Sequence, residues 1–129
     1  MKITLEQVIE NSNYVQTNGP DAGKKRLVCN LEKMKSWKKS RIEDFFDEND
    51  KLISKPSNDA NDEHKIIANT RKYVRKSLQA IIKDAKKKDD KIKPNIGLYG
   101  KLTAQLISKE NIMGKFKNAE VELNSEEND

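Results

Sequence analysis

Four residues in the stretch KPNIGLYGKLT, at positions 93–103, have the types and spacing of a phosphate-binding turn. Gly97 and Gly100 lie three positions apart, Lys101 follows directly, and Thr103 comes two positions later. Glycine turns expose backbone N–H groups to phosphate oxygens, and a lysine adds positive charge. A Walker A loop, however, needs four residues between its glycines, then Gly-Lys-Ser/Thr in succession, after a buried strand. The residues before this stretch are mostly charged, so we expect no nucleotide site here.

The Gly-x-x-Gly letters of the same stretch also resemble the backbone clamp of KH domains, which hold nucleic acid with this turn between two helices. The resemblance covers only these few residues. Thr103 stands where that family usually has an aliphatic residue, and the sequence predicts no strands for the KH sheet. We therefore expect Pro94 to stop the preceding helix and Asn95 or Gly97 to begin the next one.

A row of cations on the longest expected helix is a stronger candidate for a binding surface. Its five lysines are spaced 7, 4, 7 and 4 residues apart and share one face at 100° per residue: Lys65, Lys72, Lys76, Lys83 and Lys87. Between Lys65 and Lys88 the only acid is Asp84. Lysines four residues apart mildly destabilise a helix. A row of cations about 6–10 Å apart suits a phosphate backbone or an acidic protein surface.

Three interpretations of this row stay open: a solvated face of a lysine-rich protein, a contact surface for nucleic acid, and a docking surface for an acidic patch on a protein partner. A membrane surface is less expected, because the helix has no tryptophan or phenylalanine at its polar boundary. The candidate binding residues are the row, its flanking cations, and basic or aromatic residues elsewhere: Lys65, Arg71, Lys72, Arg75, Lys76, Lys83, Lys86, Lys87, Trp37, Tyr99 and Lys101.

Trp37, the only tryptophan, lies in the basic run KMKSWKKSR at positions 33–41. An aromatic side chain among cations can stack on the bases of a single strand. Alternatively, Trp37 covers the edge of a thin core, and we favour this second interpretation.

Few residues could support catalysis or hold a metal. His64, which we expect on the surface, is the only histidine, and Cys29 is the only cysteine. One of each is too few for a zinc site of ordinary composition. The acidic run at 47–50 lacks the glycine and the closing glutamate of an EF-hand loop. We expect no enzyme, no metal and no cofactor.

Composition limits the core and places the charge. Of the 129 residues, 34% are apolar and 36% are charged, so the core must be thin. The net charge of +5 hides an asymmetry: residues 65–101 carry twelve basic and three acidic groups, whereas residues 118–129 carry five acids and no base. No signal peptide or run of eighteen apolar residues is evident, so a soluble, cytoplasmic protein is expected. The excess of Lys, Asn and Ile is typical of AT-rich genomes such as those of many phages.

Periodicity predicts an all-α fold, a small bundle of about five helices with one long basic helix. Apolar spacing and capping boxes at Thr4 and Ser40 predict helices over about 5–11, 26–39, from 40 through Phe46, 62–88 and 98–108, with a short one after Ile112. On the long helix the expected buried face is Ile67, Val74, Leu78, Ile81 and Ala85. Residues 1–117 are expected to form one domain, with a possible internal boundary at 54–62, followed by a disordered acidic tail at 118–129.

These observations favour a non-enzymatic accessory or regulatory protein of phage type. We expect it to bind nucleic acid, or machinery bound to nucleic acid, through its basic helix. The alternative is a protein-binding modulator that docks on an acidic patch of a host complex such as RNA polymerase, without touching nucleic acid. No small-molecule substrate is evident.

Overall fold

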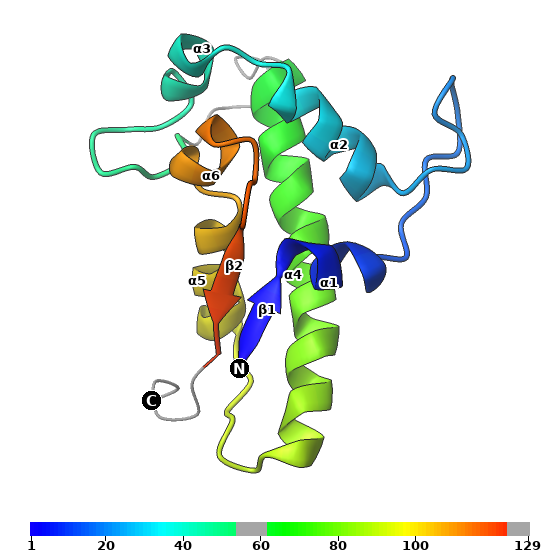
Figure 1. The fold of residues 1–129 in the computed structure, drawn as a ribbon, viewed down its shortest axis with the longest axis vertical. Helices are drawn as coiled ribbons and strands as arrows, with labels where there is room; N and C mark the ends of the chain where they lie inside the picture. The colour runs from blue at the N-terminus through cyan, green and yellow to red at the C-terminus, as the bar shows by residue number, and fades with distance from the viewer. Residues whose placement is uncertain (54–61, 124–129) are drawn as a thin grey trace.

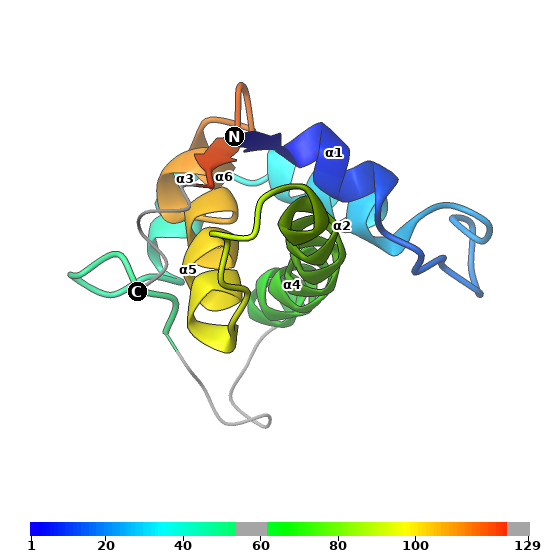
Figure 2. The ribbon, with the colours of Figure 1, turned by 90° about the horizontal axis from the view of Figure 1, so that it is seen from below.

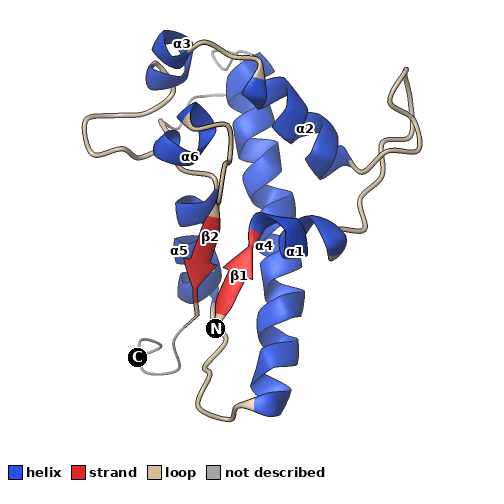
Figure 3. Ribbon diagram, in the orientation of Figure 1, coloured by secondary structure: helices blue, strands red, loops and turns tan. Residues whose placement is uncertain are grey.

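The computed structural model describes residues 1–53 and 62–123. These residues form a mostly helical fold with one small sheet (Figures 1 and 3). The elements in chain order are β1 (Lys2–Thr4), α1 (Leu5–Glu10), α2 (Arg26–Lys35), α3 (Lys39–Glu43), α4 (Asp62–Lys88), α5 (Ile96–Leu106), α6 (Lys109–Met113) and β2 (Glu120–Glu122). The helical prediction is therefore confirmed, but the fold is not all-α, because β1 and β2 pair. The expected boundary at 54–62 lies outside the described residues, apart from the first position of α4.

The long helix α4 organises the other elements. It has 27 residues, and so runs for about 40 Å at 1.5 Å per residue. It packs against α5, α2 and α1. Figure 2 looks along α4 and shows α5 on one side of it and α1 and α2 on the other. One long face of α4 is left exposed to solvent.

The buried face of α4 is wider than the predicted stripe. Ile67, Val74, Leu78 and Ala85 are buried as expected, but Ile82 is fully buried and Ile81 is only partly so. Because α4 is covered on two sides, its buried arc extends beyond a single stripe. Ile82 lies eleven residues, about three turns, beyond Arg71. Residues about three turns apart point in nearly the same direction. Because Arg71 contacts the end of α5, Ile82 faces α5 as well.

Several helix ends differ from the prediction: α5 spans Ile96–Leu106 instead of 98–108, and α6 begins at Lys109, before Ile112. α1 begins as expected, with Thr4 as the N-cap of a complete capping box. The expected helix over 26–39 ends at Lys35, and α3 then begins at Lys39 with Lys38 as its N-cap. The predicted capping box at Ser40 is therefore wrong. α3 is also too short to include Phe46, which pairs with Leu52 in an isolated β-bridge.

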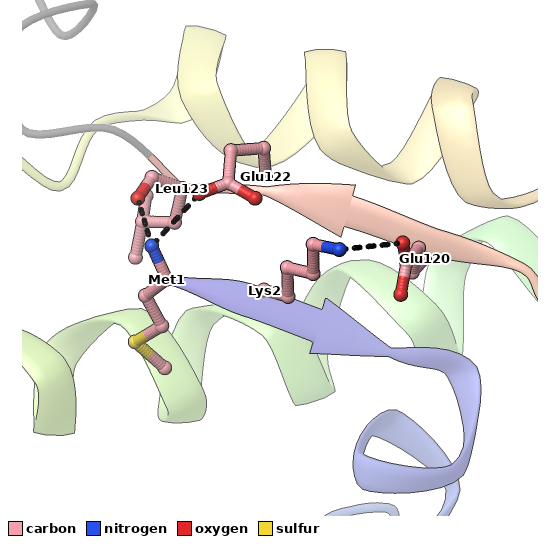
Figure 4. Close-up of polar contacts among 5 residues, drawn as sticks. All are labelled: Met1, Lys2, Glu120, Glu122 and Leu123. Carbon is pink, nitrogen blue, oxygen red and sulfur yellow. Dashed lines mark hydrogen bonds and ion pairs between the residues drawn. The ribbon is translucent and has the colours of Figure 1, made fainter.

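The ends of the described chain are joined by an antiparallel pair of strands. Ile3 lies opposite Val121 in the register of β1 and β2. In Figure 4 the α-amino group of Met1 donates to Glu122 Oε1 at 2.9 Å and to the carbonyl oxygen of Leu123 at 3.1 Å. Figure 4 also shows the exposed ion pair between Lys2 and Glu120, which are 3.5 Å apart. The side chains of Ile3, Val121 and Leu123 belong to the core.

The expected disordered tail from residue 118 is therefore wrong for residues 118–123. In the sequence Glu-Val-Glu-Leu at 120–123, acidic and apolar residues alternate. Such alternation places the apolar side chains on one face of a strand and the acids on the other. The acids dominated the composition of the segment and hid this signal. Residues 124–129 lie outside the part of the chain that the structure describes.

Candidate nucleic-acid interface

The exposed face of α4 carries most of the predicted binding residues. Seven cations of α4 that were candidates are exposed: Lys65, Lys72, Arg75, Lys76, Lys83, Lys86 and Lys87. From Lys65 to Lys87 the helix rises about 33 Å. Five of these cations have no hydrogen-bond or ion-pair partner among the described residues. We call them the outer row: Lys65, Lys72, Arg75, Lys83 and Lys87.

Acidic groups lie away from the outer row. Asp84, the only acid between Lys65 and Lys88, lines a cleft of about 690 Å³ between α1 and the second half of α4, together with Glu10 and Asp89. Within the described ranges, no ion pair involves a member of the outer row. The positive charge of this face is therefore not neutralised by the neighbouring side chains that the structure describes.

Two exposed lysines of α4 also hold other segments in place. Lys76 Nζ donates to the hydroxyl of Tyr14 at 2.6 Å and so ties the loop after α1 to α4. Lys86 Nζ donates to the carbonyl oxygens of Asp90 at 3.0 Å and Ile92 at 2.8 Å, which closes the turn that follows α4. Their positive charges still add to the potential of the face.

Arg71 contributes to packing rather than to the exposed face. Its Nη2 donates to the carbonyl oxygen of Ile107 at 3.0 Å, and its guanidinium lies 6.0 Å from the centre of the Phe46 ring. Ile107 is the C-cap residue of α5, so Arg71 satisfies a helix-terminal carbonyl that would otherwise lack a partner. Burial, followed by the charge of Arg75, lowers the pKa of Arg71 from its ordinary value. The sequence did not reveal this contact, since Ile107 lies 36 positions away.

The three candidates outside α4 do not join the outer row. Trp37 is half-buried, with its ring centre 5.8 Å from that of Phe45, so it covers the edge of the core as we favoured. Tyr99 is 5% exposed, which leaves its ring no surface for a partner. Lys101 is exposed, but it lies on α5. The turn at 93–103 begins a helix, because Asn95 is the N-cap of α5 and accepts the backbone N–H of Leu98 at 2.8 Å.

A polar groove between α2 and the first half of α4 adjoins the exposed face. It is an open depression of about 510 Å³, and apart from Ile66 every described lining residue carries a cation or an amide: Gln16, Arg26, Asn30, Lys33, Lys65 and Asn69. Arg26 donates from Nε to Gln16 Oε1 at 3.1 Å and from Nη1 to the Tyr73 hydroxyl at 3.1 Å. Asn30 Nδ2 donates to Asn69 Oδ1 at 3.0 Å. These bonds fix the side chains, and none of the described residues that line the groove carries a carboxylate.

An exposed tyrosine lies beside this groove and was not a candidate from sequence. The Tyr14 ring centre is 4.4 Å from that of Tyr73, with an interplanar angle of 47°, and Tyr14 is 38% exposed. Burial raises the pKa of Tyr73, but hydrogen bonds with Asn69 and Arg26 and the charges of Arg26 and Lys72 lower it overall. Tyr14 lies 62 positions before Lys76, and no periodic pattern in the sequence links the two.

His64 and Cys29 are both buried. His64, expected on the surface, is buried, and its ring centre is 6.1 Å from that of Phe45. His64 is the second residue of α4 whose side chain is described. It is buried because α3 and the following loop pack over this end of the helix. Cys29 is buried on α2. Among residues 1–53 and 62–123 there is no group of side chains that could hold a metal ion.

In the described ranges, no helix combines the length and the apolar character needed to cross a membrane. No protein-family model matches the chain, and neither the curated proteins nor the solved structures include a significant match to it. The functional argument therefore depends on the geometry and charge of this chain alone.

Proposed function

We propose that this protein is a non-enzymatic accessory protein that binds nucleic acid, with the exposed face of α4 against the phosphate backbone. The observation that carries the proposal is the outer row, five exposed cations over about 33 Å of helix, none of which forms an ion pair within the described residues. The groups gathered on this side of the molecule are cations and amides, which bind phosphates and base edges. We therefore expect the protein in the cytoplasm, where it would meet nucleic acid.

The charge of the row predicts a strong dependence on salt. A protein that neutralises Z phosphates of a duplex loses affinity with a slope of about −0.9Z in log K against log salt. If all five cations of the outer row contact phosphates, affinity falls roughly 500-fold between 50 and 200 mM salt.

A nucleic acid fits this face better than a protein surface does. Protein interfaces depend on aromatic and large aliphatic side chains at their centre. The exposed apolar residues of α4 are only Ala68 and Ala80 among its described side chains. The surface of α4 itself therefore has charge to attract a partner but only these two small apolar side chains to anchor a protein.

The test uses two matched triple variants. Lys72, Lys83 and Lys87 are changed together to Gln, which keeps a helix propensity close to that of Lys. The control changes Lys51, Lys115 and Lys117 to Gln; these lysines are also exposed but lie away from α4. Binding of a fluorescent DNA is measured by anisotropy at several salt concentrations.

We expect the first variant to bind more weakly and its salt slope to become shallower by roughly two to three units, near one unit for each lysine replaced. We expect the control variant to keep most of the wild-type slope of log K against log salt. The melting temperature of the first variant should stay constant or rise slightly, since repulsion within the row is relieved. Absence of salt-sensitive binding near 50 mM salt would show that the proposal is wrong. Loss of binding to an acidic protein in the first variant alone would then favour the protein-docking alternative.

A further inference from the structure

Resting on the proposed function, we propose that the protein prefers single-stranded nucleic acid, with Tyr14 stacking on one unpaired base and the α2–α4 groove receiving another. The outer row would hold the phosphates of the same strand. In a duplex the bases are stacked and paired, so neither Tyr14 nor the groove could reach a base face or a complete base edge.

Tyr14 has the surroundings of a stacking platform. Tyr14 is 38% exposed, the Tyr73 ring centre lies 4.4 Å from its ring centre, and the Lys76 ammonium lies 4.7 Å from that centre. Lys76 fixes the hydroxyl at 2.6 Å, which limits the orientations of the ring before any ligand arrives. Proteins that bind single strands combine such aromatic side chains with cations along the backbone path.

The groove offers groups that match base edges. Besides their internal hydrogen bonds, the amides of Gln16, Asn30 and Asn69 keep further N–H donors and oxygen lone pairs, and Arg26 keeps further donors. Amide and guanidinium groups are the side chains that read base edges by paired hydrogen bonds. The groove has a volume of about 510 Å³ and is open to solvent. Because internal hydrogen bonds already fix Arg26 and Asn30, little order has to be gained on binding.

The platform and the groove lie along one side of α4. Lys65 and Asn69 line the groove, Tyr73 follows one turn later, and Lys76 holds Tyr14 after a further three residues. One turn of α-helix rises about 5.4 Å, so successive sites on this side are separated by steps that neighbouring nucleotides of one strand can span. Lys83 and Lys87 continue the phosphate path beyond Tyr14.

The local charge also favours an anionic ligand. Arg26, Lys33 and Lys65 line the groove, and no carboxylate is among its lining residues in the described part of the chain. The lowered pKa of Tyr73 has the same origin, because hydrogen bonding and nearby cations stabilise its negative form despite burial. A phosphate that enters beside the groove would meet the same positive potential.

The first arm of the experiment changes the platform. Binding of oligothymidylate and oligouridylate of about twenty nucleotides, and of a duplex of equal length, is measured by anisotropy. We expect the wild type to bind both single strands more tightly than the duplex. Tyr14→Ala should weaken single-strand binding by about 5- to 150-fold, the range for loss of one stacked base, with little change for the duplex. Tyr14→Phe, which keeps the ring, should stay within about twofold of the wild type.

The second arm tests the groove without touching α4. Lys33 lines the groove, whereas Lys35, two positions later on α2, is exposed in a cleft on the other side with Glu6 and Glu120. Lys33→Gln should make the single-strand salt slope shallower by roughly 0.7 units, the value for one phosphate neutralised. Lys35→Gln carries the same change of charge and should leave the slope unchanged. Circular dichroism of each variant checks that the fold is intact.

Three results would overturn the inference in distinguishable ways. If Tyr14→Ala and Lys33→Gln are folded and bind single strands like the wild type, the groove and platform are not used, although the proposed function stands. If no oligonucleotide binds near 50 mM salt, both proposals are wrong. If polyglutamate binds instead and Lys33→Gln abolishes that binding, the groove serves an acidic protein.

Discussion

Removal of the C-terminal strand should strongly destabilise the protein. A chain that ends at Lys117 loses β2, the register partner of β1, and the buried side chains of Val121 and Leu123. A chain that ends at Leu123 is the matched control, because it keeps both strands and the whole of the described core.

The magnitude follows from burial. Val121 is 4% exposed and Leu123 is 3% exposed. Full burial of one such side chain contributes about 1.5–3 kcal/mol, so the two together contribute about 3–6 kcal/mol, before the strand hydrogen bonds are counted. Domains of this size have total stabilities of about 5–15 kcal/mol. The loss is therefore a large fraction of the total. The exposed ion pair between Met1 and Glu122 adds at most about 1 kcal/mol.

Urea unfolding followed by circular dichroism at the helical minimum measures both truncated chains and the full chain. We expect the chain that ends at Lys117 to lose at least about 3 kcal/mol, which corresponds to a melting temperature roughly 10 °C lower. The chain that ends at Leu123 should match the full chain within about 1 kcal/mol. If the shorter chain melts within about 3 °C of the full chain, Val121 and Leu123 do not belong to the core and the reasoning fails.

Three further predictions concern single side chains. Arg71→Met should destabilise by about 1–3 kcal/mol in urea unfolding, because it leaves the carbonyl oxygen of Ile107 without its donor; Arg75→Gln, which relieves repulsion on Arg71, should not destabilise. Asn95→Ala should cost about 1 kcal/mol in the same assay, through loss of the N-cap of α5. In an ultraviolet titration Tyr73 should ionise below its ordinary pKa of 10.0. The stabilisation from that ionisation is present above pH 10 and is lost as the pH falls through the lowered pKa, so stability near pH 7 is unaffected.

The long helix could be predicted well from sequence because its signals are local. Apolar spacing and the absence of glycine and proline predict α4 over 62–88, and the structure has Asp62–Lys88. The lysine spacing likewise predicts a shared exposed face, since a helical period fixes the relative direction of the side chains.

Features that depend on partners far along the chain could not be predicted. Arg71 has the sequence context of a flanking cation, but its guanidinium contacts Ile107 on another helix. Tyr14 lies in a loop, and its position beside the groove depends on packing against Tyr73. The strand at Glu120–Glu122 is three residues long and needs β1, at the opposite end of the chain, to form.

Chemical footprinting of lysines tests the central claim most directly, because it maps the contact surface on the unmodified sequence. The protein is acetylated briefly with and without saturating oligothymidylate, and the modification of each lysine is measured by mass spectrometry. We predict that the oligonucleotide protects Lys65, Lys72, Lys83 and Lys87 and leaves the modification of Lys51, Lys115 and Lys117 unchanged. If the oligonucleotide binds but the two sets are protected equally, or only the second set is protected, the exposed face of α4 is not the binding surface.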